Sequence, residues 1–554
     1  MTTHFQNLED GNRNTCFNCC FCTRRERCFA CVLVVVPILL IFGLAIVLIV
    51  NALLVTDEFE RLELDPFPTL LNSSDEVILA RAKRLGGGIK IKSVSYNSSH
   101  QETEEFVKLI KYINDTYPNI RKAKFITRYE VNTFSIIYRV EGTEITENPY
   151  MLCGHLDVVP EGNTERWEYD TFLGNIIEDN GEKYVYGRGA VDAKHSVFGI
   201  LEVLEYIAHN LKQPKRTFYV AFGHDEEVGG SNGAGEIKKS MIDLLAKNEE
   251  KLDFILDEGT FVVKGMFPGV DDPLIVISVA EKGWATIDLK IEGEQTHSSM
   301  PPRESTIGVL ANAVSNLEKY RQPSRFGQGP EYDTVRYAAA HANFGYKIVM
   351  GNLWLFSSLI SSRLGNKKVT DAMQRTTTAV TVVRAGLKEN IIPGVATAVI
   401  NHRIHPADTL EMVLQHDMDT IDDERVNLTV RRYFDPPKVS PYSSDSIPFQ
   451  VIANSALDVY PEAKVVPSIL VGNTDTIHYV DLCDRIYRFS PMFMIPQDVD
   501  RFHGIDERIN VKTYDKVSKQ SVKTLKDTFE SYLYNYLIIM IAKKSNEKLI
   551  PFIV

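Results

Sequence analysis

The sequence predicts an α/β fold with a mostly parallel central sheet, and two observations support this prediction. Short apolar strands over 150–157, 217–223 and 253–257 alternate with helical patterns, such as 191–210. Alternation of this kind favours parallel strands that helices cover on both faces. Polar motifs directly follow the strands, and ligands of such sheets bind at the strands' carboxyl ends. We therefore expect a ligand site along that edge.

The pattern changes near residue 283, where a second, smaller unit is predicted. Its strands and helices resemble an α+β domain that is inserted into the first domain. The expected strands are 284–293, 377–385, 395–405 and 426–434, and the expected helices are 304–320 and 408–418. The segment 323–376 is additional and contains an apolar run, Ile348–Ile360.

Further elements complete the α/β unit on either side of this insertion. A helix over 104–117 and a strand hairpin over 124–141 precede the first buried strand. The α/β pattern returns from about residue 447 and closes with a helix over 513–542. The net charge of −12 and the pI near 5.6 argue against a nucleic-acid partner, because such proteins usually present a basic face.

An uncharged apolar run over 29–55 predicts a transmembrane helix. Roughly 20 such residues cross the hydrocarbon core, whereas the apolar part of a cleaved signal peptide has only about 7–15. Basic flanks stay in the cytosol, so the large C-terminal part is expected to be lumenal or extracellular. The basic residues before the run are Arg24, Arg25 and Arg27, and the acidic residues after it are Asp57, Glu58 and Glu60.

Two sets of residues agree with this topology. Four Asn-x-Ser/Thr acceptors follow the span, at Asn72, Asn97, Asn114 and Asn427, and suggest N-glycosylation. Six of the eight cysteines crowd the tail and the start of the span: Cys16, Cys19, Cys20, Cys22, Cys28 and Cys31. Cysteines beside a membrane favour S-palmitoylation, with a zinc knuckle or an unmodified tail as alternatives. Only Cys153 and Cys483 remain, so disulfides contribute at most one bridge.

Two motifs place an acid beside a histidine or after a glycine-rich turn. In Gly154-His155-Leu156-Asp157, positions i and i+2 of a strand share a face, so Asp157 can hold the imidazole of a metal-binding His155. In Tyr186-Gly-Arg-Gly-Ala-Val-Asp192, the glycines permit a tight turn that delivers Asp192 to the next helix. Its two oxygens can bridge two cations; capping that helix is the alternative.

Three more motifs add carboxylates and a second histidine. In Glu226-Glu227, a cation bound by one carboxylate offsets the repulsion between the two. The other carboxylate can then take a proton from a water whose pKa is lowered. Asp257 and Glu258 follow another strand, and His503 lies in Phe502-His503-Gly504. Histidine and carboxylate ligands with a vacant position are typical of a catalytic zinc site.

Together and in this order, the motifs resemble the dinuclear zinc metallopeptidase family of aminoacylase, carboxypeptidase S and the N-fatty-acyl-amino-acid synthase/hydrolase. The resemblance covers about residues 75–545. It implies two Zn²⁺ per subunit and a catalytic domain with an inserted lid and dimerisation domain. The regions expected are a cytosolic tail (1–28), a transmembrane helix (29–55), a stalk (56–75), a first catalytic segment (76–282), the inserted domain (283–436) and a second catalytic segment (437–554).

The resemblance also implies which residues bind the metal ions. One zinc ion would be held by His155 and by an acid of the Asp257/Glu258 pair, where family members differ. The implied ligands of the second ion are Glu227 and His503. A carboxylate that bridges the two ions is implied at Asp192.

Catalytic and substrate-binding roles follow from the same resemblance. Glu226 is the implied general base, and Asp157 the residue that orients His155. His297 would reach a neighbouring active site in a homodimer and stabilise the tetrahedral oxyanion. The implied substrate-binding residues are Asn390, Arg403 and Gly472, the last in a loop whose second family glycine is Asn473 here.

The expected function is hydrolysis, or reversible formation, of the amide bond of N-acyl amino acids. A carboxypeptidase acting on short peptides is the main alternative, and a receptor-like ectodomain without catalysis is the second. The apolar run Ile348–Ile360, with Trp354 and Phe356, would line an acyl groove in the first case. Packing within or between the inserted domains is an equally good explanation of that run.

Overall fold

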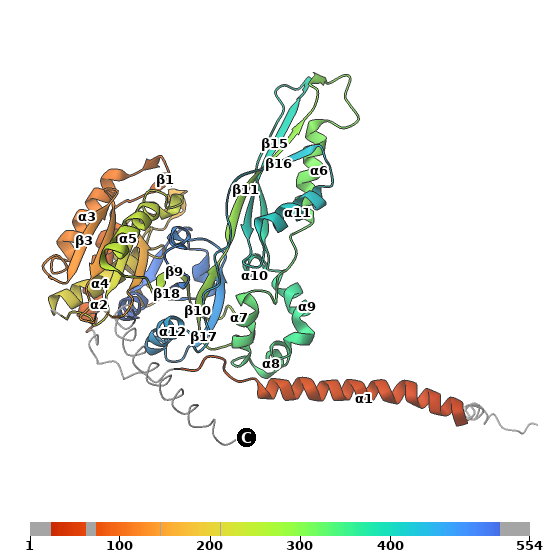
Figure 1. Cartoon of the computed structure of the whole chain (residues 1–554), viewed down its shortest axis with the longest axis horizontal. Helices are drawn as coiled ribbons and strands as arrows, with labels where there is room; N and C mark the ends of the chain where they lie inside the picture. The colour runs from red at the N-terminus through yellow and green to blue at the C-terminus, as the bar shows by residue number, and fades with distance from the viewer. Residues whose placement is uncertain (1–23, 62–73, 145, 211, 521–523, 525–554) are drawn as a thin grey trace, which may run out of the picture.

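An eight-stranded sheet forms the centre of the larger domain in the computed structural model, which describes residues 24–61, 74–144, 146–210, 212–520 and 524 (Figure 1). The strand order is β17-β10-β18-β9-β5-β8-β4-β3. The strands are β3 (Ile126–Val131), β4 (Ser135–Val140), β5 (Tyr150–His155), β8 (Phe218–Gly223), β9 (Ile255–Val263), β10 (Leu274–Glu281), β17 (Lys464–Leu470) and β18 (Ile486–Met494).

This sheet is mixed, which corrects the prediction of a mostly parallel one. Of the seven neighbouring pairs, four are parallel (β17–β10, β18–β9, β9–β5 and β5–β8) and three are antiparallel. The antiparallel pairs arise because the predicted hairpin, β3–β4, joins one edge of the sheet and because β10 runs against β18. The parallel centre, β18-β9-β5-β8, is the region that carries the polar motifs.

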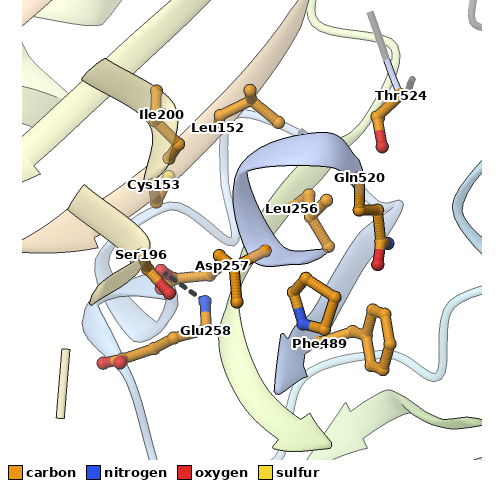
Figure 2. Close-up of a pocket in the computed structure, with 12 residues that line it drawn as sticks. Leu152, Cys153, Ser196, Ile200, Leu256, Asp257, Glu258, Phe489, Gln520 and Thr524 are labelled. Carbon is orange, nitrogen blue, oxygen red and sulfur yellow. Dashed lines mark hydrogen bonds between the residues drawn. The ribbon is translucent and has the colours of Figure 1, made fainter. Parts of the chain in front are cut away.

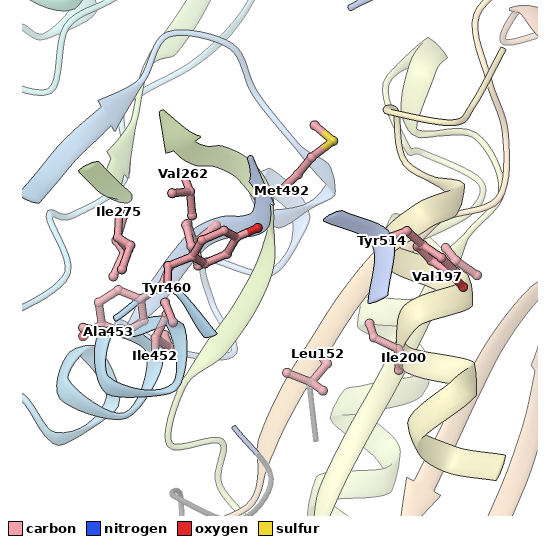
Figure 3. Close-up of a cluster of buried hydrophobic side chains, with 14 of the residues drawn as sticks. Leu152, Val197, Ile200, Val262, Ile275, Ile452, Ala453, Tyr460, Met492 and Tyr514 are labelled. Atoms are coloured by element: carbon pink, nitrogen blue, oxygen red, sulfur yellow. The ribbon is translucent and has the colours of Figure 1, made fainter. Parts of the chain in front are cut away.

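Helices cover both faces of this sheet, as the apolar strands require. Alternate residues of β5 point to opposite faces: Leu152 packs in the cluster that contains α4 (Lys194–His209), whereas Met151 packs with α5 (Ala234–Asn248). Figure 3 shows Leu152 beside Val197 and Ile200 of α4. The other helices of this unit are α2 (Asp75–Ile89), α3 (Thr103–Thr116) and α12 (Ile447–Val459).

Smaller elements surround the carboxyl edge of the sheet. A three-stranded sheet of β19 (Arg508–Asn510), β7 (Glu182–Tyr186) and β6 (Ile176–Asp179) carries the chain into the Asp192 turn. A short ribbon pairs β1 (Ser95–Asn97) with β2 (His100–Gln101). Residues 511–520 are helical, and most of the helix expected over 513–542 lies outside the described residues.

The inserted domain contains a second sheet, in the order β13-β15-β11-β16, and projects away from the first (Figure 1). Its strands are β11 (Gly283–Glu292), β13 (Thr377–Ala385), β15 (Val395–Ile404) and β16 (Val426–Phe434). Helix α6 (Thr306–Lys319) packs on the sheet and contacts α11 (Leu410–Ile421). A small ribbon joins β12 (Thr296–His297) to β14 (Ile391–Ile392). These elements match the predicted ones to within a few residues.

The additional segment 323–376 forms four helices: α7 (Pro330–Ala339), α8 (Phe344–Met350), α9 (Leu353–Leu364) and α10 (Lys368–Met373). Helix α7 packs on β17 of the large sheet, where the Thr334 hydroxyl donates to the Pro467 carbonyl at 2.7 Å. The unit that was expected to be one insertion over 283–436 thus contributes some of its chain to the core of the larger domain.

Helix α1 (Arg24–Leu54) is long and apolar enough over Val34–Leu54 to cross a membrane, with a mean hydropathy of 3.0. Most of its side chains from Val34 onward are exposed. The tail cysteines 16, 19, 20 and 22, with Asn72, lie outside the described residues. Cys153 and Cys483 are both free and buried.

Candidate active site

The predicted site residues of the larger domain converge near the carboxyl edge of the eight-stranded sheet. They belong to five segments that are distant in the sequence: the end of β5 with His155, the turn before α4 with Asp192, the η2 turn after β8 (Glu226–Val228), strand β9 with Asp257 and Glu258, and the loop before β19 with His503.

Asp192 joins the two histidines of this site. Its Oδ1 lies 3.1 Å from Nε2 of His155, and its Oδ2 lies 2.6 Å from Nε2 of His503. Glu227 Oε2 lies 3.5 Å from the same nitrogen of His503. Asp192 is 6% exposed, so one buried carboxylate presents an oxygen to each half of the site.

Asp157 connects the end of β5 to the η2 turn. Its Oδ1 lies 3.2 Å from Nδ1 of His155. The same carboxylate accepts hydrogen bonds from the backbone amides of Glu226 (3.1 Å) and Glu227 (3.2 Å). Asp157 is fully buried. His155 Nδ1 also lies 3.0 Å from the Asp157 carbonyl oxygen, so Asp157 contacts the imidazole through its backbone and its side chain and links it to the two neighbouring glutamates.

The structure separates the two acids of the Asp257/Glu258 pair. Glu258 Oε1 lies 3.1 Å from Nε2 of His155, on the side that also faces Asp192. Asp257 Oδ1 accepts from the Glu258 amide at 2.9 Å, and its Oδ2 is buried without a hydrogen-bond partner among the described residues. Only Glu258 of this pair reaches the histidine.

A bulge in β9 explains this separation and corrects the expectation that the pair ends its strand. Strand β9 continues to Val263, and its register with β18 shifts so that Asp257 and Thr260 are paired while Glu258 and Gly259 are not. Gly259 has a φ of 149°, and a Cβ there would lie 2.7 Å from that of Arg488. Bulges re-aim side chains beside active sites.

The donor atoms are arranged so that they could hold a divalent cation. Two overlapping groups, each with its ligand atoms within 4.8 Å of one another, are His155–Glu226–Glu258 and His155–Asp192–Glu227. Imidazole nitrogen and carboxylate oxygen are donors that zinc accepts. His503 completes the second group through its contacts with Asp192 and Glu227.

The carboxylates of the site outnumber the positive charges near them. Burial raises the pKa of Glu226 well above its usual range, and the charge of Glu227 adds to the effect. Burial likewise raises the pKa of Glu258 to about 7. A cation at this place would offset the repulsion and hold the carboxylates ionised.

A buried ion pair that the sequence analysis did not assign holds two of these segments in register. Arg188 Nη1 donates to Glu507 Oε2 at 2.6 Å, and its Nη2 donates to the Gly504 carbonyl at 3.0 Å. Glu507 Oε1 accepts from the amides of Val191 (2.7 Å) and Asp192 (3.2 Å). The pair therefore positions both the Asp192 turn and the His503 loop. Arg188 lies within the Asp192 motif and Glu507 lies three residues after the His503 motif, but no local pattern shows their pairing.

A cleft of about 480 Å³ opens between the glutamates and the inserted domain. Glu226 and Glu227 line one side; Arg403 and Arg432 line the other, with the Arg432 guanidinium 5.4 Å from the ring centre of Trp284. Arg403, predicted to bind a substrate carboxylate, thus faces the carboxylate cluster across the cleft.

The predicted substrate loop forms another wall of this cleft through Asn473, Thr474 and Asp475, directly after Gly472. Asn473 accepts a hydrogen bond from Arg403. The loop is held from behind by the buried pair Glu281–Arg488, whose charged atoms lie 2.6 Å apart. Glu281 also accepts from the Thr474 amide at 3.3 Å.

A small cavity of about 40 Å³ lies behind the metal-binding candidates (Figure 2). Asp257 and Glu258 line one side of it, and Leu152, Cys153 and Ile200 contribute apolar surface. Its size admits a few water molecules.

Two predicted residues do not reach the cleft within one chain. His297 is exposed on β12, where its Nδ1 lies 2.8 Å from the Ser299 hydroxyl. Asn390 lies in the adjoining loop and contacts it through its carbonyl, which accepts from the Ser298 amide at 3.1 Å. Neither lines the cleft described above.

Residues 151–527 match peptidase family M20/M25/M40. The chain belongs to this family and is a metal-dependent hydrolase. It is 37% identical to an N-fatty-acyl-amino acid synthase/hydrolase of Homo sapiens over 443 residues, which cover 80% of this chain and 86% of the relative. It is 36% identical to a probable carboxypeptidase S-like protein of Dictyostelium discoideum over 510 residues, or 89% and 93% of the two chains.

Solved structures show the same fold. An M20 family metallo-carboxypeptidase from Sulfolobus solfataricus superimposes with a TM-score of 0.57 at 17% identity, over 81% of this chain and 99% of its own. Human carnosine dipeptidase 1 also has a TM-score of 0.57, at 14% identity, over 84% and 99%.

Replacing Arg188 with Met tests the importance of the buried ion pair. Glu507 would be left buried without its partner, so the free energy of unfolding is expected to fall by about 3–5 kcal/mol, measured by urea denaturation. Lys438→Met is the matched control, because its ion pair with Asp484 is exposed; it should change stability by less than about 1 kcal/mol. Equal, small effects of both substitutions would contradict the assigned role.

Proposed function

We propose that this protein hydrolyses, and in reverse forms, the amide bond of N-acyl amino acids. The cleft carries this proposal, because it places Arg403 and Arg432 opposite Glu226 and Glu227. Arginine suits a planar carboxylate because its guanidinium donates two parallel hydrogen bonds. A substrate with a free carboxylate and an amide bond fits this arrangement. Its carboxylate would bind the arginines, while its amide bond would lie near the glutamates. Relatives named N-fatty-acyl-amino acid synthase/hydrolase, 37–41% identical, support a fatty acyl group.

The ligand geometry supports two zinc ions per chain. His155 and Glu258 would hold one, Glu227 and His503 would hold the other, and Asp192 would bridge them. Bound there, the ions would polarise the amide carbonyl and lower the pKa of the attacking water. Asp257 is left out of the ligand set because its contacts are with the Glu258 amide and not with His155.

Glu226 is the residue that we assign as general base. It lies in the cleft wall beside Glu227, and its backbone amide is fixed by Asp157. Its raised pKa suits a group that accepts a proton from water and returns it to the leaving amine. The same transfers in reverse allow an amino acid and a fatty acid to condense.

His297 and Asn390 are proposed to act in the active site of a second subunit. The two residues are neighbours on the inserted domain but lie outside the cleft of their own chain. A homodimer formed through the inserted domains would bring each His297 to the partner's cleft, where it would stabilise the oxyanion.

Exopeptidase activity on short peptides is the second candidate. The alignment with the carboxypeptidase S-like protein covers 89% of this chain, compared with 77–80% for the N-fatty-acyl relatives. A C-terminal peptide residue presents the same carboxylate and amide, so the cleft accepts both classes in principle. The substrate panel described below distinguishes them.

We further propose that α1 anchors the protein in a membrane with the catalytic domain on the lumenal or extracellular side. The uncharged span and its basic N-terminal flank support this orientation. Of the glycosylation acceptors, Asn97 and Asn427 have exposed side chains. Palmitoylation of the tail cysteines remains a prediction from the sequence.

Activity should be measured on the full chain with N-acyl amino acids of several acyl lengths and with dipeptides. We expect cleavage of N-acyl amino acids that a zinc chelator abolishes. Glu226→Gln should lower kcat by about 10²–10⁴-fold while the thermal midpoint stays unchanged. Glu236→Gln, in an exposed helical position, should retain full activity. Preferred cleavage of dipeptides would select the exopeptidase, and no turnover of any substrate by folded, zinc-loaded protein would contradict both.

Co-expression of His297→Ala with Glu226→Gln tests the shared active site. Each variant alone should be nearly inactive. In a random mixture half of the dimers are mixed, and one of their two sites combines an intact Glu226 with the partner's intact His297, so about a quarter of wild-type activity should return. No recovery, in dimers shown to contain both variants, would contradict the proposal.

A further inference from the structure

Helix α8 and the start of α9 pack against the C-terminal end of α1 (Figure 1). Asn51 Nδ2 donates to Asn352 Oδ1 at 2.8 Å, and Asn352 Nδ2 donates to the Leu48 carbonyl at 3.0 Å. Ala52 is fully buried, and a Cβ added to Gly351 would lie 3.6 Å from its Cα. The contact is close and its buried polar groups are paired, so the position of α9 is tied to that of α1.

The contacts continue past the end of α1 toward the larger domain. Asp57 lies 3.1 Å from His341, and Glu58 lies 3.5 Å from Arg336, which is on α7. Phe59 is buried against Phe449 of α12. The chain that leaves α1 is therefore attached to the larger domain from its first residues onward.

One face of α9 is exposed and carries three large apolar residues. Trp354, Leu355 and Leu359 are 63%, 42% and 49% exposed; they span about 140° of the helix surface, which they share with the exposed Ser358 and Ser362. The indole nitrogen of Trp354 donates to Asn352 Oδ1 at 3.3 Å, while most of its ring is uncovered. None of the three lines the catalytic cleft, so the apolar run expected to form an acyl groove faces elsewhere.

Several cations lie close to this face in the sequence. Lys347, Arg363, Lys367 and Lys368 all lie on or beside α8 and α9, and none has an ion-pair partner in the region of the chain that the structure describes. The nearby acid, Asp371, is paired with Arg321 and Arg375. Long basic side chains can place their charge among lipid headgroups while their stems cover apolar surface.

We propose that residues 344–364, the α8–α9 hairpin, form a second membrane contact. In this contact the exposed face of α9 enters the bilayer interface beside α1. This inference rests on the proposed membrane anchor. The uncharged apolar run of α1 ends at Val55, and Asp57, Glu58 and Glu60 follow it. Charged residues mark the end of a span at the edge of the hydrocarbon core. The end of α1 therefore lies at this edge, on the catalytic side.

The height of the contact explains why the occupant is lipid. The atoms that contact Asn352 and Gly351 belong to the last two turns of α1, so the start of α9 lies within about 9 Å of the edge of the hydrocarbon core. Tryptophan with an uncovered ring and a paired N–H is favoured close to that edge. Two contacts, α1 and α9, would fix the orientation of the catalytic domain above the bilayer, which a single helix leaves free to rotate.

Tryptophan quenching in the full chain tests this proposal. The protein has three tryptophans, Trp167, Trp284 and Trp354, and is reconstituted into vesicles of phosphatidylcholine and phosphatidylserine with brominated acyl chains. Lipids brominated at carbons 6 and 7 should quench some of the emission, and those brominated deeper should quench less. The quenched component should disappear in Trp354→Phe. Quenching that is absent, or the same in both proteins, would overturn the proposal.

Placing acidic residues on the exposed face of α9 provides the second measurement. Leu355→Asp with Leu359→Asp should lower the quenching of Trp354 at least twofold. Ile242→Asp, an equally exposed apolar residue on α5 (49%), should leave it unchanged. If both variants behave alike, the face is not in lipid, and the proposal is wrong.

Two further measurements on the same vesicles separate this proposal from those on which it rests. Resistance to alkaline carbonate reports the α1 anchor, and turnover of a short-chain N-acyl amino acid reports the active site. Anchored, active protein without quenching overturns the hairpin contact alone, including the case in which a second copy of the chain covers α9. Extraction by carbonate overturns the anchor and the hairpin contact together.

Discussion

The position of the Asp192 carboxylate determines how the candidate site is assembled. Its two oxygens reach His155 and His503, which come from opposite ends of the catalytic chain. Three other carboxylates, those of Glu226, Glu227 and Glu258, lie partly buried within the same small volume. Such a cluster is costly without cations, and bound metal ions would offset that cost. The buried ion pairs around the site, Arg188–Glu507 and Glu281–Arg488, hold the segments that carry these carboxylates in place.

The carboxyl edge of the sheet was predictable because the His155 motif ends an apolar strand and the Glu226-Glu227 motif follows another. What the sequence did not decide is which acid of the Asp257/Glu258 pair faces His155. That choice depends on a bulge opposite Arg488, a residue more than 200 positions away in the chain. The pairing of Arg188 with Glu507 was missed for the same reason, since a long-range contact has no local pattern.

Two predictions, for His297 and for the apolar run Ile348–Ile360, stayed open because these residues lie outside the active site of their own chain. His297 is exposed on the inserted domain, and its role depends on a second subunit. For the apolar run Ile348–Ile360 the sequence left an acyl groove and packing of the inserted domain as equal alternatives, because sequence alone does not show what apolar residues contact. Its place beside α1, through Asn352, shows which neighbour it has.

The zinc content of three purified proteins tests the assignment of the site most directly. After dialysis against metal-free buffer, we predict two zinc ions per chain in the wild type and in Asp257→Asn, and about one in Glu258→Gln, measured by plasma mass spectrometry. Loss of zinc from Asp257→Asn with both ions retained in Glu258→Gln would contradict the assignment, because the ligand would then be the acid that faces away from His155.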